Sequence, residues 1–290
     1  MLHRCIKSIA TQTWQDLEIV ILDDASDPPI ETGYLKSLAP ATPIYCLRAD
    51  KQLGLNAVRN QLIETATGDI FFIIDDDAYF QDDHALDDVA SAFAAEPELG
   101  IVATKILDYR GGSVRPLTPH SRRHIRKDAS ILEDSHLISY FLGGAHGMRR
   151  SVIEQCGPYD EVLMYGLDEI ELAYRALEKE FKIKYLPAVV VHHEPPPAPP
   201  GAKKVSAWRL YYLTRNRILF AYKHLPFPYF LSYVPSWLSW YGYQAITNGL
   251  LSDYWKGIRD GFRTLEQINR KPISEKTIVY LKANYGRLWR

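Results

Sequence analysis

The chain has 290 residues, a length that suits one large α/β domain with an appendage or two smaller domains. Its 34 basic and 35 acidic residues leave a formal net charge of -1, which argues against nucleic-acid binding driven by a basic surface. Three scattered cysteines are too few for a disulfide framework or a zinc site and favour a reducing compartment. We therefore expect a globular protein with no nucleic-acid partner, whose charges act locally.

The first 107 residues alternate between helical patterns and short apolar runs that end in turns or acids. "LEIVILDDAS" (17–26) is typical of a buried parallel strand that ends in a loop. In chain order the patterns predict helices at 2–13, 55–67 and 84–96, and strands at 17–26, 43–49, 69–75 and 100–107. Strands that alternate with helices imply an α/β fold with a Rossmann-like, mostly parallel sheet flanked by helices.

The second half begins with a polar stretch at 108–136, which we interpret as a mobile loop. "DEIELAYRALEKE" (168–180) predicts a helix with acids in its first turn, and "KIKYLPAVVVHH" (182–193) predicts a strand. The proline-rich "EPPPAPPG" (194–201) then ends the α/β pattern. The sequence therefore predicts an α/β domain at 1–200 and a helical, aromatic-rich region at 201–290.

Acidic residues gather at the ends of the predicted strands and at the start of one helix. They are Asp23 with Asp24, Asp75 with Asp76 and Asp77, and Asp168 with Glu169. Open parallel sheets bind ligands outside the carboxyl ends of their strands, so one pocket could gather all three clusters. In an extended chain Asp75 and Asp77 share one side while Asp76 points away, an arrangement that suits a hard divalent cation. A DxD triplet alone is weak evidence, because surface turns often contain one.

The stretch "GLNAVRNQLIETATGDIFFIIDDDA" (54–78) resembles the segment that leads into the acidic motif of family-2 glycosyltransferases. Residues 4–26 are similar to that family's first helix and second strand, and residues 141–176 to its acceptor-side signature. The resemblance covers most of residues 2–194. It implies a GT-A fold and inverting transfer of a sugar from a nucleotide-diphosphate sugar to a hydroxyl acceptor, with Mn²⁺ or Mg²⁺ as cofactor.

The resemblance also suggests roles for residues near the donor. Asp77 matches a metal ligand, with Asp75 nearer the ribose, and Asp24 matches the base-recognising aspartate. The predicted donor contacts are Asp23, Asp24, Arg59, Asp75 and Asp76. For Asp23 and Asp24 a helix or turn cap is the alternative, and for Arg59 a solvated place on a helix face.

Two acids stand where the family has its catalytic base. Counting back from Arg175, Glu169 occupies the position of the base and Asp168 that of the preceding acid. The family more often has Glu before Asp, so the choice between the two residues stays open. Both could instead cap a helix.

Histidine and glycine complete the predicted site. Strand alternation lets only one of His192 and His193 face the pocket, and the family's spacing from Pro187 favours His193 as a metal ligand. For either histidine a purely structural role is the alternative. Gly143 and Gly144 could let the backbone approach the donor sugar or the acceptor, although glycines needed only for turns would look the same.

The sequence departs from the family at its start, which lies inside the helix that follows the family's first strand. We therefore expect the first strand to be missing, which would leave neighbouring backbone groups unpaired. A catalytically impaired sugar-nucleotide-binding or scaffold protein is thus the alternative function. A nucleotidyltransferase fits less well, because it would need a basic, glycine-rich phosphate loop near the N-terminus.

The tail "WRLYYLTRNRILFAYKHLP" (208–226) resembles the C-terminal extension of bacterial rhamnosyltransferase-like members. It interleaves aromatic residues with Arg209, Arg215, Arg217 and Lys223, and residues 226–252 then carry no Asp, Glu, Lys or Arg. This pattern suits a membrane surface with a saccharide or lipid-linked saccharide acceptor, and packing against the domain is the alternative. With no secretory signal visible, we expect a cytoplasmic protein, peripheral on the inner face of the plasma membrane, in cell-surface polysaccharide synthesis.

Overall fold

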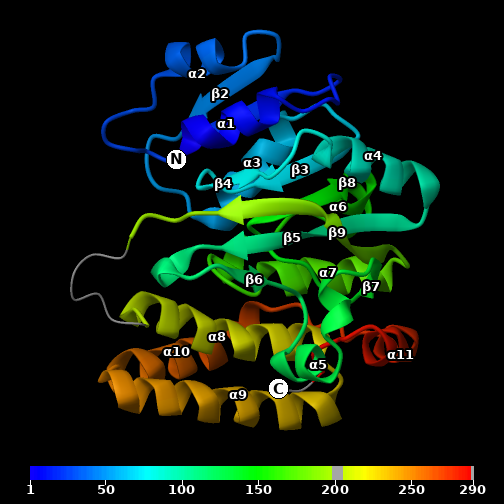
Figure 1. Ribbon diagram of the computed structural model, residues 1–290. Coiled ribbons are helices and arrows are strands. Elements are labelled where there is room, and N and C mark those ends of the chain that lie inside the picture. Colours follow the sequence, from blue (N-terminus) through cyan, green and yellow to red (C-terminus); the bar gives the residue numbers. More distant parts are fainter. Residues whose placement is uncertain (198–204, 289–290) are drawn as a thin grey trace.

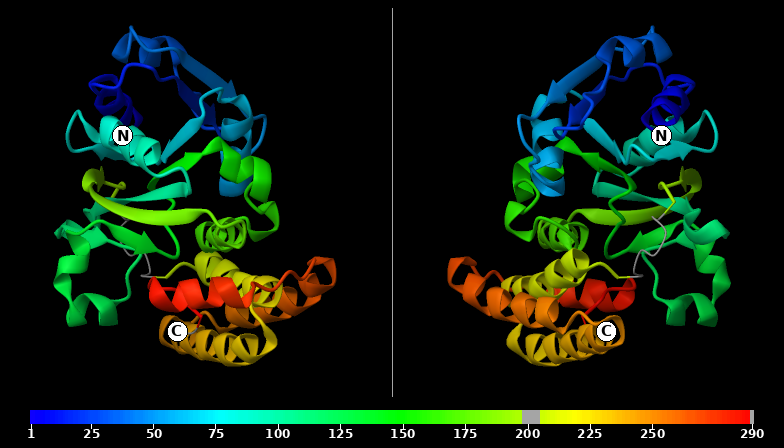
Figure 2. Two further views of the ribbon diagram at one scale, coloured as in Figure 1. Left: turned by 90° about the vertical axis from the view of Figure 1, so that its right-hand side faces the viewer. Right: turned by 90° about the vertical axis from the view of Figure 1, so that its left-hand side faces the viewer.

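The protein is known from a computed structural model, which describes residues 1–197 and 205–288. A seven-stranded sheet forms its centre, and a separate two-stranded sheet lies near the N-terminus (Figure 1). Figure 2 shows the N-terminal elements at one end of the molecule and the C-terminal helices at the other. The proline-rich segment predicted at 194–201 extends beyond the described residues.

The elements follow the predicted alternation of helices and strands. The strands are β1 (Ile19–Asp23), β2 (Ile44–Arg48), β3 (Ile70–Ile74), β4 (Ala78–Phe80), β5 (Leu99–Asp108), β6 (Arg115–Leu117), β7 (His136–Ile138), β8 (Ala145–Arg149) and β9 (Lys182–His193). The helices are α1 (Leu2–Ala10), α2 (Thr32–Leu38), α3 (Leu55–Thr65), α4 (Ala85–Ala95), α5 (Arg122–Lys127), α6 (Arg150–Cys156), α7 (Asp168–Glu178), α8 (Ala207–His224), α9 (Phe227–Asn248), α10 (Leu251–Thr264) and α11 (Glu275–Ala283).

Every helix and strand predicted before residue 194 is present, with ends shifted by a few residues. The interpretation of 108–136 as a loop is wrong, because this stretch contains β6, α5 and the first residue of β7. These elements are three to six residues long, so none has room for a recognisable periodicity. Strand β8 was missed as well, because its sequence "AHGMR" has no apolar run.

The seven-stranded sheet has the order β3-β8-β5-β9-β4, with β6 beside β5 and β7 beside β9. Strands β5 and β9 are parallel, as are β1 and β2, whereas β8 runs antiparallel to both β3 and β5. The sheet is therefore mixed rather than mostly parallel. In the described part of the chain no strand joins the β1–β2 pair to β3.

One hydrophobic core extends from the sheet into the C-terminal helices. Ile101 and Tyr185 in the sheet, Leu172 in α7, Phe220 in α8 and Leu281 in α11 belong to it, and all are fully buried. Burying large apolar side chains contributes roughly 1.5 to 3 kcal/mol each, so these helices are bound to the sheet by the same force that folds it. Helix α7, which carries the paired acids, lies between the sheet and α8.

Helix α10 packs closely on α8 through two glycines. A Cβ atom on Gly257 would lie 2.8 Å from the carbonyl oxygen of Tyr211, and one on Gly261 would lie 2.8 Å from Cδ1 of Ile218. A side chain at Gly257 would clash with the backbone of α8, and one at Gly261 would have to move Ile218, so glycine at these positions lets the two helices approach each other. This contact fixes which face of α10 turns toward solvent.

Buried charges connect α7 to α8. Glu171 accepts hydrogen bonds from Arg175 of its own helix and, at 2.9 Å, from His224 of α8. Lys223 of α8 also contacts this carboxylate at 2.9 Å. The hydrogen bond from His224 and the charges of Arg175 and Lys223 more than offset the effect of burial and hold the pKa of Glu171 well below its usual range. Helices α7 and α8 are thus linked by ion pairs as well as by apolar packing.

The four cations of the segment expected at a membrane surface lie on α8, and most of them have partners inside the molecule. Arg217 is buried with its guanidinium 3.6 Å from the ring centroid of Trp237, and Arg215 donates to the carbonyl of Val162. Lys223 pairs with Asp160 and Glu171, which leaves Arg209 as the exposed member of the four. Interleaved aromatic and basic residues therefore mark a packed helix here. None of the helices in the described residues combines the length and apolar character needed to cross a bilayer.

Candidate active site

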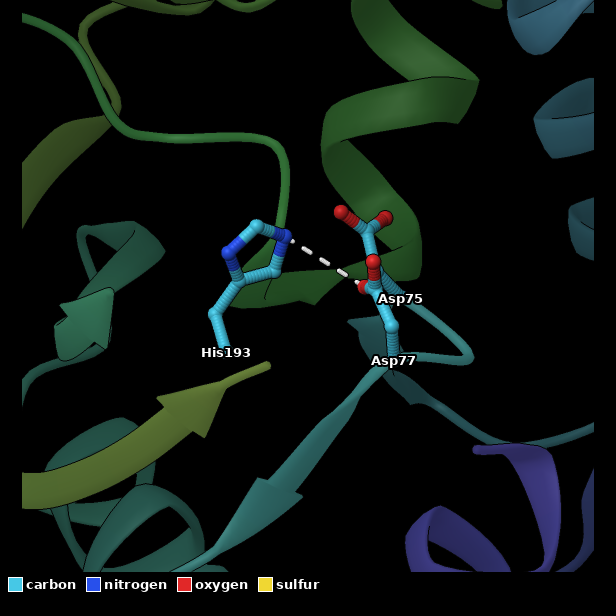
Figure 3. Close-up of side chains that lie close together, drawn as sticks. All are labelled: Asp75, Asp77 and His193. Carbon is cyan, nitrogen blue, oxygen red and sulfur yellow. Dashed lines mark ion pairs between the residues drawn. The ribbon is translucent and has the colours of Figure 1, made fainter. Parts of the chain in front are cut away.

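Asp75, Asp77 and His193 form a cluster where β3 ends and β4 begins (Figure 3). One potential ligand atom from each lies within 4.8 Å of the others, and Nε2 of His193 is 3.3 Å from Oδ1 of Asp77. Strand pairing produces this geometry, because Ala78, which follows Asp77, lies opposite His193 in the β4–β9 ladder. The predicted metal residues are therefore brought together by backbone hydrogen bonds.

The electrostatics of this cluster suit a cation. Burial raises the pKa of Asp77, and repulsion by Asp75 and Asp76 adds to that effect against the attraction of His193. Asp76 is exposed, as the alternation of the chain predicted. Two carboxylates and one imidazole are a donor set that Mn²⁺ accepts readily and Mg²⁺ can share with water.

The two neighbouring histidines have different partners. His192 faces away from the cluster: its Nδ1 is 2.7 Å from the hydroxyl of Tyr109, and its ring stacks on Tyr79. His193 reaches the cluster with Nε2 and lies 3.0 Å from Asp108 with Nδ1. Asp108 was not predicted, although it directly follows the apolar strand "GIVATKIL", the same signal that pointed to Asp23 and Asp75.

The paired acids have unequal environments. Asp168 is fully buried in an ion pair with Arg59, and its Oδ1 has no hydrogen-bond partner among the described residues. The side chain of Glu169 is 23% exposed, with Oε1 4.0 Å from Nη1 of Arg59. Burial raises the pKa of Glu169 to about 8, Asp168 adds to the effect and Arg59 opposes it. Of the two acids, Glu169 is the accessible one and can hold a proton near neutral pH.

Other residues predicted to contact a donor are engaged within the protein. Arg59 is buried against Asp168 rather than solvated on its helix. Asp23 accepts hydrogen bonds from the backbone of Ser26 and Ile30 and pairs with Arg48. Against the effect of burial, these bonds lower the pKa of Asp23 to about 2, so this side chain stabilises the turn after β1.

Asp24 is partly exposed, and its Oδ1 accepts a hydrogen bond of 2.7 Å from the backbone of Leu53. This contact connects the end of β1 to the loop that precedes α3. Both oxygens of Asp23 accept hydrogen bonds from the turn that follows it. Asp24 uses only Oδ1 in its contact with the backbone of Leu53. Asp24 is therefore the member of the pair better placed to meet a ligand.

Gly143 and Gly144 bring the cluster and the paired acids side by side. A Cβ atom on Gly143 would overlap Oε1 of Glu169 and the guanidinium of Arg59. A Cβ atom on Gly144 would lie 3.2 Å from Oδ2 of Asp75, whose backbone N–H donates to the carbonyl of Gly144. A side chain at Gly143 would therefore displace Glu169 and Arg59, and one at Gly144 would crowd Asp75.

One cavity lies away from this site. A cavity of about 460 Å³ opens between α5 and α11 and is lined by residues that include His124, Lys127, Lys282 and Tyr285. None of its lining residues belongs to the acidic site. This cavity is therefore separate from the acidic cluster at the strand ends.

Comparison with known proteins places this geometry in context. Residues 1–157, more than half of the chain, match the profile of the family described as Glycosyl transferase family 2. The protein of Bacillus subtilis described as "uncharacterized glycosyltransferase YwdF" is 24% identical over 214 residues, which cover 72% of this chain and 75% of that protein. The acids of α7 and His193 lie beyond the part that matches the profile.

Solved structures share the fold at low sequence identity. Staphylococcus aureus TarS in complex with UDP is 16% identical, with a TM-score of 0.54 over 76% of this chain and 61% of that chain. GalNAc-T7 with UDP, GalNAc and Mn²⁺ is 15% identical, with a TM-score of 0.60 over 91% and 53%. The mannosyltransferase PcManGT from Pyrobaculum calidifontis, with GDP-Man and Mn²⁺, is 14% identical, with a TM-score of 0.54 over 97% and 75%. The predicted GT-A fold is thereby confirmed.

We expect Gly143→Ala to destabilise the protein by about 1 to 3 kcal/mol, because the new methyl group must displace Glu169 and Arg59 from a packed site. Urea denaturation would measure the free energy of unfolding. Gly33→Ala on α2 is the matched control, since no atom lies within 4 Å of the place its new methyl group would take and alanine favours the helix. Equal stability of Gly143→Ala and the wild type would show that this contact is not a constraint.

Proposed function

The chain belongs to glycosyl transferase family 2, and on this premise we propose that it transfers a sugar from a nucleotide-diphosphate sugar to a hydroxyl group, inverting the anomeric carbon. One observation carries the proposal. The cluster of Asp75, Asp77 and His193 adjoins Glu169 across Gly143 and Gly144, so groups suited to the leaving diphosphate and to the attacking hydroxyl face one site. An inverting transfer needs both.

Asp75, Asp77 and His193 would hold the divalent cation, Mn²⁺ or Mg²⁺. Such an ion neutralises the negative charge that develops on a diphosphate leaving group. The structures of GalNAc-T7 and PcManGT, which contain Mn²⁺ with UDP or GDP-Man, support this choice of ion and donor class. Asp24, Asp75 and Asp76 remain the proposed contacts for the nucleotide. Asp23 and Arg59 support the site through their internal ion pairs.

We assign the general base to Glu169. Its carboxylate is accessible and its raised pKa matches the task of taking a proton from a hydroxyl group near neutral pH. Asp168 is less suited, because Arg59 holds it in a buried ion pair. We propose that Asp168 and Arg59 together orient the first turn of α7, which carries Glu169.

The acceptor is proposed to be a saccharide or lipid-linked saccharide at the inner face of the plasma membrane, in cell-surface polysaccharide synthesis. We divide the chain into a catalytic domain at 1–200 and a C-terminal region at 201–290, and we propose that the C-terminal region makes the membrane contact. The exposed face of α9 supports this, because it carries Phe227, Leu231, Tyr243 and Ile246 on a helix without any charged residue.

Helix α10 adds cations to this surface. Tyr254, Gly257 and Gly261 face inward, so the opposite side of the helix exposes Trp255 and Phe262. Lys256, Arg259 and Arg263 are exposed beside them, with Arg259 paired to Asp260. Aromatic side chains next to Lys and Arg suit the headgroup region of an anionic bilayer.

We expect Glu169→Gln to reduce transfer by about a hundred- to ten-thousand-fold while donor binding stays close to wild type. The amide keeps the size and hydrogen bonds of the side chain but cannot accept the proton. After a screen of UDP-, GDP- and dTDP-sugars, release of the nucleoside diphosphate from the best donor would give the rate. Glu154→Gln, at an exposed position on α6, is the matched control.

Two results would count against this assignment. If Glu169→Gln keeps its turnover while Asp168→Asn loses it without loss of stability, the base is Asp168. If the wild-type rate does not rise with pH toward about 8, no group with the raised pKa of Glu169 acts as the base. The rate should rise and not fall with pH, because a general base works only after it has lost its own proton.

For the membrane contact, we expect the full chain to sediment with vesicles that contain phosphatidylglycerol and far less with pure phosphatidylcholine. Replacing Trp255 and Phe262 together by Ser should weaken binding by about tenfold or more, since burying a large apolar side chain is worth roughly 1.5 to 3 kcal/mol. The matched control replaces Tyr34 and Tyr45 by Ser, which are 52% and 51% exposed at the opposite end of the molecule. Equal binding by both double variants would exclude the outer face of α10 as the contact.

A further inference from the structure

Asp108 is the only carboxylate among the described residues that hydrogen-bonds the far side of the metal-cluster histidine. Nδ1 of His193 lies 3.0 Å from Oδ1 of Asp108, while Nε2 of the same ring points to Asp77 at 3.3 Å. A neutral imidazole has one protonated nitrogen and one free lone pair. If Nδ1–H donates to Asp108, the lone pair of Nε2 is directed into the cluster.

We propose that Asp108 is a positioning residue that fixes the tautomer and orientation of His193 for cation binding. The inference rests on the metal site of the proposed function and adds to it a residue that touches neither the cation nor the donor. A carboxylate behind a ligating histidine holds the ring in place and raises its basicity as a ligand. Asp108 would perform both tasks here.

The backbone places these residues in register, so the contact does not depend on a flexible side chain. Asp108 lies opposite His193 in the parallel β5–β9 ladder and opposite Arg115 in the antiparallel β5–β6 ladder. His193 in turn lies opposite Ala78, the residue after Asp77. One row across four strands therefore runs from Arg115 through Asp108 and His193 to the metal cluster.

Two arginines fix the other side of Asp108. Nε of Arg110 is 3.0 Å and 3.2 Å from its two carboxylate oxygens, and Nε of Arg115 is 3.5 Å from Oδ2. Both arginine side chains are about half exposed, so water could solvate them without Asp108. Asp108 is fully buried, and a buried carboxylate is costly unless it is paired and hydrogen-bonded. Pairing with the half-exposed Arg110 and Arg115 does not by itself explain why Asp108 is buried here.

The first test is Mn²⁺ affinity of the full chain, measured from the electron paramagnetic resonance signal of free Mn²⁺. We expect Asp108→Asn to bind Mn²⁺ about 10 to 100 times more weakly, because the neutral amide holds the ring less firmly. Arg110→Gln, which removes a partner of Asp108 but leaves the contact with His193, should stay within about threefold of wild type.

Unchanged affinity in Asp108→Asn, with Asp77→Asn clearly weakened, would overturn the inference and leave the metal site standing. Unchanged affinity in both variants would contradict the metal site itself.

The second test reads the histidine directly, with Mg²⁺ as a diamagnetic substitute for Mn²⁺. In ¹⁵N spectra of labelled protein with saturating Mg²⁺, assigned by loss of the signal in His193→Gln, we expect wild-type His193 to be protonated at Nδ1 and to carry no proton at Nε2. Asp108→Asn should shift the ring toward a mixture of tautomers under the same conditions, an effect that a general loss of stability would not produce. A wild-type ring that stays protonated at Nε2 with Mg²⁺ bound would overturn the proposal.

Discussion

Repulsion among buried and partly buried carboxylates is the constraint on which the rest of this site depends. Asp75, Asp77, Asp108, Asp168 and Glu169 all gather near the ends of β3, β5 and β9. Asp168 is balanced by Arg59, and Asp108 by Arg110 and Arg115. Within the described residues, Asp75 and Asp77 have no Lys or Arg at ion-pair distance and face His193 alone. A divalent cation is the partner that this remaining pair of charges accepts most readily.

Much of this site was visible in the sequence because local rules produce it. Acids that directly follow an apolar strand must lie at the end of that strand, which located Asp23 and Asp75 correctly. The alternation of a strand also explains why Asp76 and His192 turn away from the cluster. The same rule would have identified Asp108, the acid at the end of the strand predicted at 100–107.

What the sequence did not reveal depends on residues far apart in the chain. The ion pair of Arg59 with Asp168 joins residues more than a hundred positions apart, so a helix-face arginine and a buried one look alike beforehand. The packing of Lys223 could not be read from the sequence for the same reason, since its partners Asp160 and Glu171 lie in other parts of the chain. The position of β8 between β3 and β5 is likewise set by tertiary pairing and not by any apolar run in its sequence.

The C-terminal helices do more than extend the chain. Through Glu171 and the shared core they hold α7, and α7 carries Glu169 into the site.

The most direct test of the central claim is the affinity of UDP and GDP, measured by calorimetry with Mn²⁺ and with chelator. The account predicts that Mn²⁺ strengthens binding of at least one nucleotide to the wild type and that Asp77→Asn abolishes this gain. Equal nucleotide affinity with and without Mn²⁺ in the wild type would contradict it.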